Sequence, residues 1–203
     1  QEFYEELPPF FKAVAESGGL MSFGSQLLAG ETKPTYSIER QVRPMNSVEK
    51  IISMRAWRGG EDNFGIASVT PGEQVLCRTG FRGMHEYTAG MVVDLYKKEW
   101  GNAPMFLPEQ IAAFEDHFVL IAHETVPDAV KGARLGPSQR LTAEMVEACE
   151  QNNIRLHGPG RPYPAGVCHR LVVEQYAQPG DVVILTDSHT PSSGVLNAFA
   201  FGV

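Results

Sequence analysis

Three residues that can bind a ligand or exchange a proton stand side by side near the end of the chain: Asp187, Ser188 and His189. They follow the apolar run 181–185, a pattern that predicts a buried strand. A carboxylate, a hydroxyl and an imidazole on one turn can orient one another and move a proton. Because open α/β sheets bind their ligands at strand ends, we expect this turn to belong to a functional site.

Two other segments place ionisable groups beside apolar runs. Asp116 and His117 precede the strand-like run 118–121, and His169 follows a loop rich in proline and glycine. A carboxylate that fixes the tautomer of an imidazole is a common way to build a general acid or base. The repetition of this pattern indicates that several acid–base residues gather at the ends of strands.

The other histidines carry weaker signals. His85 stands just before the predicted helix 88–100, and the N-terminus of a helix favours an anion. His123 and His157 are not part of a comparable motif, and we expect both to lie on the surface. The sequence therefore adds His85 alone to the candidate site.

Two hydrolase chemistries compete for these residues. A Ser-His-Asp hydrolase is disfavoured, because the G-x-S-x-G pattern is absent around Ser188. In an extended chain His189 would also point away from its neighbour Ser188. A metal hydrolase remains open, in which side chains bind the metal directly. Its ligands would be Asp116, His117, His169 and Asp187.

Composition limits the classes of partner. The chain has 203 residues, a net charge of −7 and a pI near 5.4. Nucleic-acid binding needs clustered Lys and Arg, which this balance disfavours. No apolar run has the length of a membrane span, and no signal-peptide pattern opens the sequence. We expect a soluble cytoplasmic protein, mitochondrial if the source is eukaryotic, that binds neither nucleic acid nor membrane.

Cysteine usage and the two ends of the sequence add two expectations. Cys77, Cys149 and Cys168 are widely spaced and form no C-x-x-C pair, which predicts reduced, buried thiols. The sequence opens on Gln1 and closes on the apolar run 197–203. We expect it to be a piece of a larger protein.

The elements that position these motifs alternate along the chain. Segment 31–47 lacks periodicity and indicates a linker, and Ser47 is a candidate N-cap. In the helix 88–100, Met91 and Leu95 are expected to face the core. The alternation predicts an α/β domain with a mostly parallel or mixed sheet flanked by helices. The predicted helices are 10–16, 48–57, 88–100 and 142–151, and the predicted strands are 118–121, 154–156 and 181–185, with a turn feeding a strand at 69–77.

Taken together, these segments resemble the aconitase superfamily: aconitase, homoaconitase and the large subunit of 3-isopropylmalate dehydratase. The resemblance lies in three runs: 166–170 (Gly-Val-Cys-His-Arg), 186–191 (Thr-Asp-Ser-His-Thr-Pro) and 198–203 (Ala-Phe-Ala-Phe-Gly-Val). Asp116-His117 is similar to the family's Asp-His motif. The resemblance covers residues 44–203 and implies the family's three-layer first catalytic subdomain.

The resemblance also implies an activity. It implies part of a hydro-lyase that removes water from a hydroxy-di- or tricarboxylate and adds it back at the neighbouring carbon. A [4Fe–4S] cluster would act as Lewis acid, with cysteine ligands outside this chain, since none of its cysteines matches the family's ligands. This segment alone is then expected to be inactive. The alternative is a non-catalytic binding or regulatory relative that lacks the cluster.

Residue roles and domains follow from the same resemblance. Asp116 and His117 would form one carboxylate–imidazole pair, and His169 would pair with Asp187 near the leaving hydroxyl. His189 would pair with an acidic residue beyond this chain, and the substrate ligands would be His85, Asp187 and Ser188. Residues 1–30 resemble the tail of a small swivelling domain, followed by the 31–47 linker. Residues 48–203 would form the catalytic subdomain, incomplete at its C-terminus, whose partners are the rest of the large subunit and a small swivelling domain or subunit.

Overall fold

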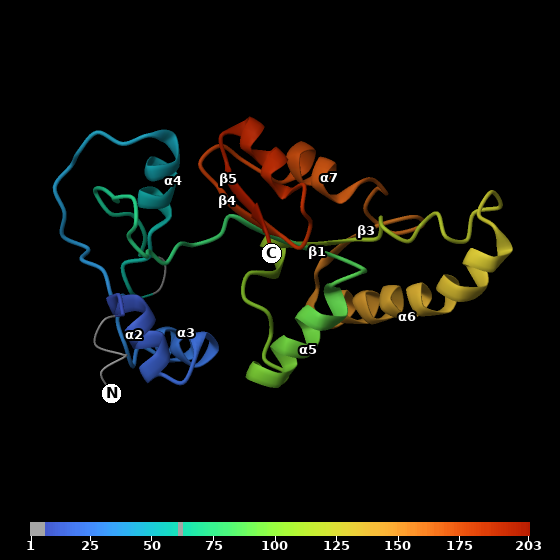
Figure 1. Cartoon of the computed structure of the whole chain (residues 1–203), viewed down its shortest axis with the longest axis horizontal. Helices are drawn as coiled ribbons and strands as arrows, with labels where there is room; N and C mark the ends of the chain where they lie inside the picture. Colours follow the sequence, from blue (N-terminus) through green and yellow to red (C-terminus); the bar gives the residue numbers. More distant parts are fainter. Residues whose placement is uncertain (1–6, 61–62) are drawn as a thin grey trace. The chain divides into compact units, whose positions relative to one another are not determined.

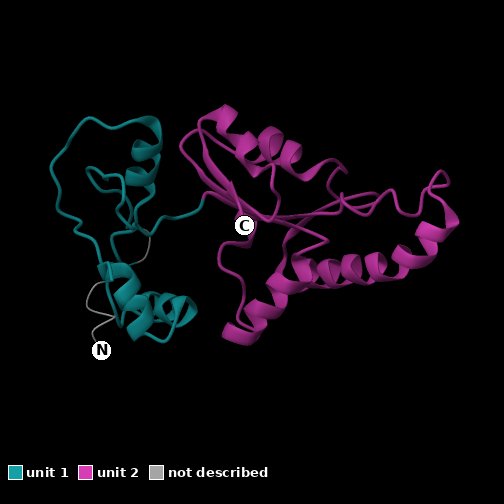
Figure 2. Ribbon diagram, in the orientation of Figure 1, with its two compact units in different colours: residues 1–79 teal, residues 80–203 magenta. Residues whose placement is uncertain are grey.

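The computed structural model describes residues 7–60 and 63–203. Residues 1–6 of the predicted N-terminal segment and the loop residues Glu61 and Asp62 lie outside the described residues. The chain divides into two compact units, Gln1–Thr79 and Gly80–Val203 (Figure 2). The candidate site residues all belong to the second unit.

The described part of the first unit contains the helices α2 (Pro9–Glu16), α3 (Leu20–Leu28) and α4 (Ser47–Arg55). Asn46, rather than the expected Ser47, caps α4. Its side chain accepts the N–H of Glu49 at 2.9 Å, and the Glu49 carboxylate accepts the N–H of Asn46 at 2.8 Å. This reciprocal capping box explains why the helix begins where it does. The strand expected at 69–77 is reduced to an isolated bridge between Ala56 and Cys77.

The second unit is built on a five-stranded sheet in which every neighbouring pair is parallel. The strand order is β3-β2-β1-β4-β5. This result confirms the predicted α/β class. The strands are β1 (Phe81–His85), β2 (Ile111–Phe114), β3 (Arg155–His157), β4 (Val182–Leu185) and β5 (Phe199–Gly202).

Helices cover both faces of this sheet (Figure 1). On one face Met84 of β1 and Ala113 of β2 belong to a core cluster with Met145 of α6. On the other, Phe81 and Phe114 belong to a cluster with residues of α7. The layers are therefore helix, sheet, helix. The connecting elements are α5 (Ala89–Trp100), the 3₁₀ helix η1 (Pro108–Gln110), α6 (Asp128–Asn152), α7 (Cys168–Gln175) and the 3₁₀ helix η2 (Thr190–Leu196).

The chain order explains where the site forms. From β1 the chain builds outward through β2 to β3, then returns to place β4 on the other side of β1 and β5 beyond it. Connections therefore leave the carboxyl ends of β1 and β4 in opposite directions. In open parallel sheets this switch point leaves a crevice in which ligands bind.

Two expectations about local structure are wrong. The run 118–121 forms turns rather than a strand, and the strand is β2, which precedes Asp116-His117. In α5 the buried side chains are Ala89 and Val93, while Met91 is 67% exposed and Leu95 is 44% exposed. Small residues pack close to the sheet there, so the larger apolar side chains of α5 face outward. No helix in the described part of the chain has the length and apolarity needed to cross a bilayer.

Candidate active site

His85, the last residue of β1, is buried with both ring nitrogens engaged. Its Nε2 lies 2.7 Å from the carbonyl oxygen of Thr186, so this nitrogen donates. Its Nδ1 accepts the backbone N–H of Tyr87 at 3.2 Å. These partners require the neutral tautomer with hydrogen on Nε2. Burial and the neighbouring His117 lower the pKa of His85 in agreement with that neutral state.

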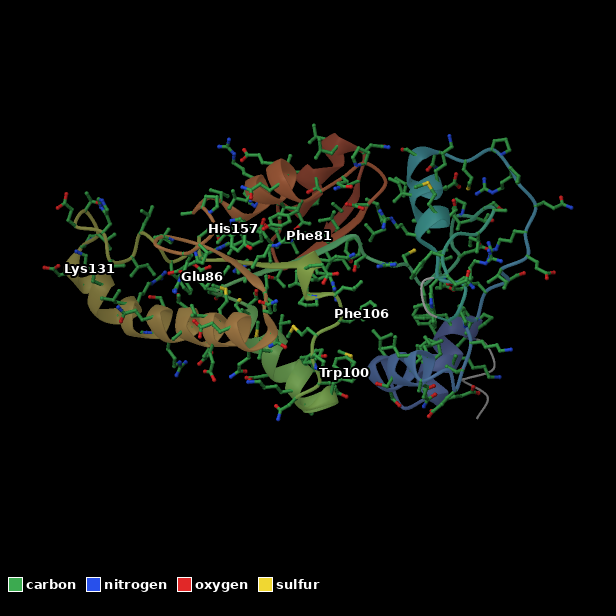
Figure 3. All side chains as sticks on the ribbon, turned by 180° about the vertical axis from the view of Figure 1, so that it is seen from behind. Phe81, Glu86, Trp100, Phe106, Lys131 and His157 are labelled. Atoms are coloured by element: carbon green, nitrogen blue, oxygen red, sulfur yellow. The ribbon has the colours of Figure 1, made fainter. Side chains whose placement is uncertain are left out.

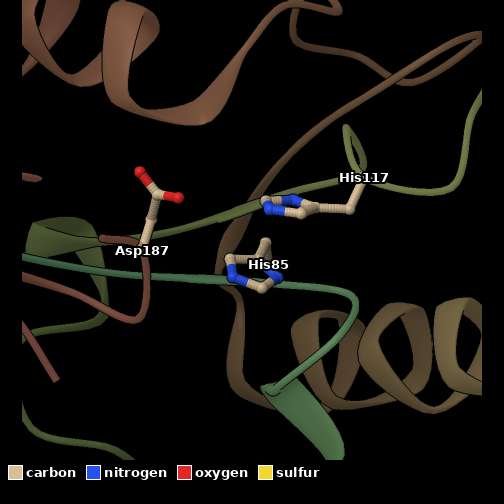
Figure 4. A group of neighbouring side chains, drawn as sticks. All are labelled: His85, His117 and Asp187. Atoms are coloured by element: carbon tan, nitrogen blue, oxygen red, sulfur yellow. The ribbon is translucent and has the colours of Figure 1, made fainter. Parts of the chain in front are cut away.

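His117 lies directly over His85 (Figure 4). The two rings stack with centroids 3.8 Å apart and an interplanar angle of 21°. His117 Nδ1 is 2.6 Å from Asp116 Oδ1, which forms the predicted carboxylate–imidazole contact. The other oxygen of Asp116 accepts the N–H of Cys168 at 2.6 Å, at the start of α7. Asp116 thus ties the loop after β2 to the N-terminus of a helix on the other side of the site.

Asp187, in the turn after β4, faces two imidazoles. Its Oδ1 lies 3.2 Å from His169 Nδ1 and 3.8 Å from His189 Nδ1. The rings of His169 and His189 stack with centroids 4.8 Å apart. The Asp187 side chain is 8% exposed, whereas that of His169 is 24% exposed and that of His189 is 68% exposed. A buried carboxylate therefore faces two imidazoles that reach solvent, through close contacts that are not hydrogen bonds.

Ser188 and His189 lie closer together than the sequence suggested. Ser188 Oγ is 3.3 Å from His189 Nδ1, and both side chains are exposed. The expectation that they point apart is wrong because residues 187–189 form a turn rather than an extended chain. The contact remains a poor nucleophile–base pair, since an exposed hydroxyl and imidazole are screened by water.

The sheet brings all seven predicted site residues to one edge. His85 ends β1, Asp116 and His117 follow β2, His169 lies in the first turn of α7, and the 187–189 turn follows β4. The side-chain hydroxyls of Thr88 and Thr186 meet at 2.5 Å and join the ends of β1 and β4. Parallel strands expose their carboxyl ends at the same edge, which explains this convergence.

Several of these side chains could share a metal ion, because their ligand atoms lie within 4.8 Å of one another. His85 is a poor ligand, since its nitrogens already have partners. Cys168 is fully buried, and burial and Asp116 raise the pKa of its thiol. The three groupings are His85, His117 and Asp187; Asp116, His117 and Cys168; and Cys168, His169 and Asp187.

The cysteines of this chain do not fit an iron–sulfur cluster. Cys77 belongs to the first unit, and Cys149 and Cys168 lie in the cores on opposite faces of the sheet. Burial raises the pKa of Cys77 to about 11 and that of Cys149 to about 12. Clusters are held by several convergent thiolates, whereas Cys149 and Cys168 are separated by the sheet and burial favours the protonated form of all three thiols.

Sequence reasoning missed two buried residues near this edge. Glu86, directly after His85, is 0% exposed, and its carboxylate accepts backbone N–H groups of the Asp116-His117 loop. His157 ends β3 and is 1% exposed, so its expected surface position is wrong. The sequence signal that could have indicated burial is its position directly after the predicted strand 154–156.

The sequence model of the Aconitase family (aconitate hydratase) matches residues 64–203. A probable methanogen homoaconitase large subunit from Methanothermobacter thermautotrophicus is 31% identical over 163 residues, covering 78% of this chain and 33% of that protein. A 3-isopropylmalate dehydratase large subunit from Sulfurisphaera tokodaii is 26% identical over 160 residues, covering 79% of this chain and 32% of that protein. The chloroplastic counterpart from Arabidopsis thaliana is 27% identical over 169 residues, covering 78% and 29%.

The chain thus spans about a third of the length of these curated relatives. The family match includes all seven predicted site residues and the whole parallel sheet. On this match, which extends over more than half of its residues, the chain belongs to the aconitase family.

Proposed function

We propose that this chain forms part of a hydro-lyase that dehydrates and rehydrates a hydroxy-di- or tricarboxylate. The observation that carries the proposal is the pair of carboxylate–imidazole contacts, Asp116–His117 and Asp187–His169, at one edge of an aconitase-family sheet. Dehydration of a hydroxy acid needs a group that gives a proton to the departing hydroxyl. Imidazoles held by buried carboxylates suit that task near neutral pH.

In each pair the carboxylate contacts Nδ1, so we assign the exchangeable proton to Nε2. Asp187 holds His169 in this way, and His169 protonates the leaving hydroxyl. Asp116 orients His117, whose side chain is 37% exposed at the same carboxyl edge of the sheet. The carboxylates stabilise the imidazolium that forms when a proton is taken back during rehydration.

The remaining residues contact the substrate or complete the site. Ser188, exposed on the turn, donates or accepts a hydrogen bond to a substrate carboxylate, and Asp187 lies beside it. His189 is exposed and pairs with an acidic residue from the rest of the protein. For His85 to bind substrate through nitrogen, it must release Thr186 or Tyr87, because both ring nitrogens are occupied.

The rest of the protein supplies the cofactor in this proposal. A [4Fe–4S] cluster bound there would provide a Lewis acid for the substrate hydroxyl and carboxylate. Its ligands come from outside this chain, since Cys149 and Cys168 lie on opposite faces of the sheet and burial raises the pKa of all three thiols. The chain's own residues handle protons and position the substrate.

The predicted domain assignment is part of the same proposal. Residues 1–30 are the tail of a small swivelling domain, 31–47 a linker and 48–203 the catalytic subdomain. Two helices, α2 and α3, are followed by a segment without regular structure up to Ser47, which supports the linker. The proposed partners are the rest of the large subunit and a small swivelling domain or subunit.

The test is an assay of the complete protein, purified anaerobically and reconstituted with iron and sulfide. The proposal predicts brown visible absorbance and hydration of an unsaturated acid such as cis-aconitate or a related dicarboxylate. Absence of hydration across such a panel, in a sample with the cluster present, contradicts the proposal. Binding of the hydroxy acid without cluster or turnover would instead support a non-catalytic relative.

A further inference from the structure

Glu86 joins the end of β1 to the loop that follows β2. Its carboxylate is fully buried, at 0% exposed, in the interior of the second unit, where Figure 3 labels it. Oε1 accepts the N–H of Phe118 at 2.6 Å, and Oε2 accepts the N–H of Asp116 at 3.2 Å. Each oxygen of this side chain therefore accepts its own backbone N–H.

These two hydrogen bonds bracket His117. They fix the backbone immediately before and after it, while Asp116 Oδ1 fixes its ring through Nδ1. The ring also stacks on His85, the chain neighbour of Glu86. The end of β1 therefore supplies both the surface on which His117 lies and the anchor for its backbone.

We infer that Glu86 is a positioning residue that sets the place of the His117 imidazole at the carboxyl edge of the sheet. It acts through the loop backbone and, being buried, does not touch the substrate. The expected effect of Glu86 on catalysis rests on the proposed function, whereas its expected effect on the position of His117 does not. Loss of one acceptor oxygen should displace His117 relative to His85 while the sheet remains intact.

The variant Glu86→Gln tests this structural consequence with little change of shape. The amide has only one acceptor oxygen, so either the N–H of Asp116 or that of Phe118 faces an NH₂ group instead. In histidine-selective NMR of the chain, the ring signals of His85 and His117 should shift, because each lies in the ring current of the other. The signals of His157, which is held by Pro164 and Tyr176 on the edge strand β3, should stay in place. Glu174→Gln on α7 is the matched control, since its side chain is 56% exposed and it should shift neither ring.

Catalysis in the complete reconstituted protein supplies a separate readout. For Glu86→Gln we expect kcat to fall by roughly a hundredfold, as for a small misplacement of a catalytic group. KM should change by about twofold or less, because no substrate contact is removed. If the unmodified protein has no hydro-lyase activity but the ring signals shift as expected, the proposed function fails and the positioning role stands. Unchanged His85 and His117 signals in a folded variant would overturn the inference.

A shift of the His157 signals would reveal that the variant does not fold. In that case hydrogen exchange in the unmodified chain tests the inference without the variant. The amides of Asp116 and Phe118 should exchange slowly, with protection close to that of amides inside β2. Exchange of both at the rate of an unstructured peptide would mean that Glu86 does not hold this loop, and the inference would be wrong.

Discussion

Two buried histidines at strand ends differ in what surrounds them. His85 lies within the candidate active site, whereas His157 is held by Pro164 and Tyr176 at the edge strand β3. His157 Nδ1 is 2.9 Å from the Pro164 carbonyl oxygen and must donate, so Nε2 accepts from the Tyr176 hydroxyl at 2.5 Å. Burial lowers the pKa of His157, and the Pro164 carbonyl opposes this effect. A neutral, structural histidine follows.

The pH dependence of stability should report this histidine. Because the pKa of His157 is lowered in the folded state, its contribution is fully present above the ordinary value of about 6.5. As the pH falls below that value the unfolded chain takes up a proton first, so stability is lost through the folded pKa. Urea unfolding from neutral to mildly acidic pH should show this decline.

The variant His157→Asn keeps a donor for the Pro164 carbonyl and removes the titrating ring. It should be less stable at neutral pH and should lose less further stability on acidification. The remaining slope includes His85, whose pKa is lowered in the same direction. A variant with the same pH slope as the unmodified chain would show that His157 does not titrate with unfolding.

Some contacts of the candidate site could be predicted from the sequence, and others could not. The Asp116-His117 motif predicted its own contact because it carries both ionisable groups, whereas the facing of His169 and Asp187 was implied by the family resemblance. Glu86 was missed, since its partners are backbone amides some thirty residues away. Such a contact leaves no pattern in composition or spacing.

At the scale of elements, the sequence prediction missed the strand β2 and placed a strand at 118–121 instead. Ile-Ala-Ala-Phe carries a weak strand signal because alanine is depleted in strands. Its four residues are all buried between helices on both faces, where small side chains allow close packing. The partly exposed run 118–121 looked more like a strand because of its valine and isoleucine. Tertiary burial, rather than local propensity, selected the strand.

A glycine in β5 tests how closely the elements pack at the site. A Cβ atom on Gly202 would lie 2.5 Å from the carbonyl oxygen of Asp187, which is backbone and cannot turn aside. Gly202→Ala should therefore cost about 1–3 kcal/mol of stability, as overpacking does. It should also displace the 187–189 turn and lower kcat of the complete protein.

Gly194→Ala in η2 is the matched control, because a Cβ there meets no atom within 4 Å. It should leave the urea midpoint and kcat nearly unchanged. Equal behaviour of the two variants would show that the close approach of β5 to the Asp187 turn is not maintained in solution.

At the scale of the molecule, the family match covers the whole parallel sheet and the site residues at its carboxyl edge. The strand order places β1 and β4 side by side at the switch point, and the predicted motifs lie at their carboxyl ends. The chain nevertheless spans about a third of its curated relatives. We therefore propose that this chain supplies acid–base groups and that the rest of the protein supplies the cluster ligands.

Replacing the cysteines separates these two contributions. In the complete reconstituted protein, alanine at Cys77, Cys149 or Cys168 should leave the visible cluster absorbance per protein unchanged, because burial raises the pKa of each thiol and disfavours the thiolate that a cluster needs. A small loss of stability is expected at the two fully buried positions. Loss of the cluster absorbance from any one folded variant would assign that cysteine as a ligand.

The central claim is that the carboxylate–imidazole pairs of this chain serve a hydro-lyase, and Asp187→Asn tests it most directly. This isosteric change removes the charge that faces His169 at 3.2 Å. In the complete reconstituted protein we predict hydration of an unsaturated di- or tricarboxylate by the unmodified form. For the variant we predict a loss of kcat of about a hundredfold or more at unchanged cluster absorbance. Undiminished kcat in Asp187→Asn would contradict the account.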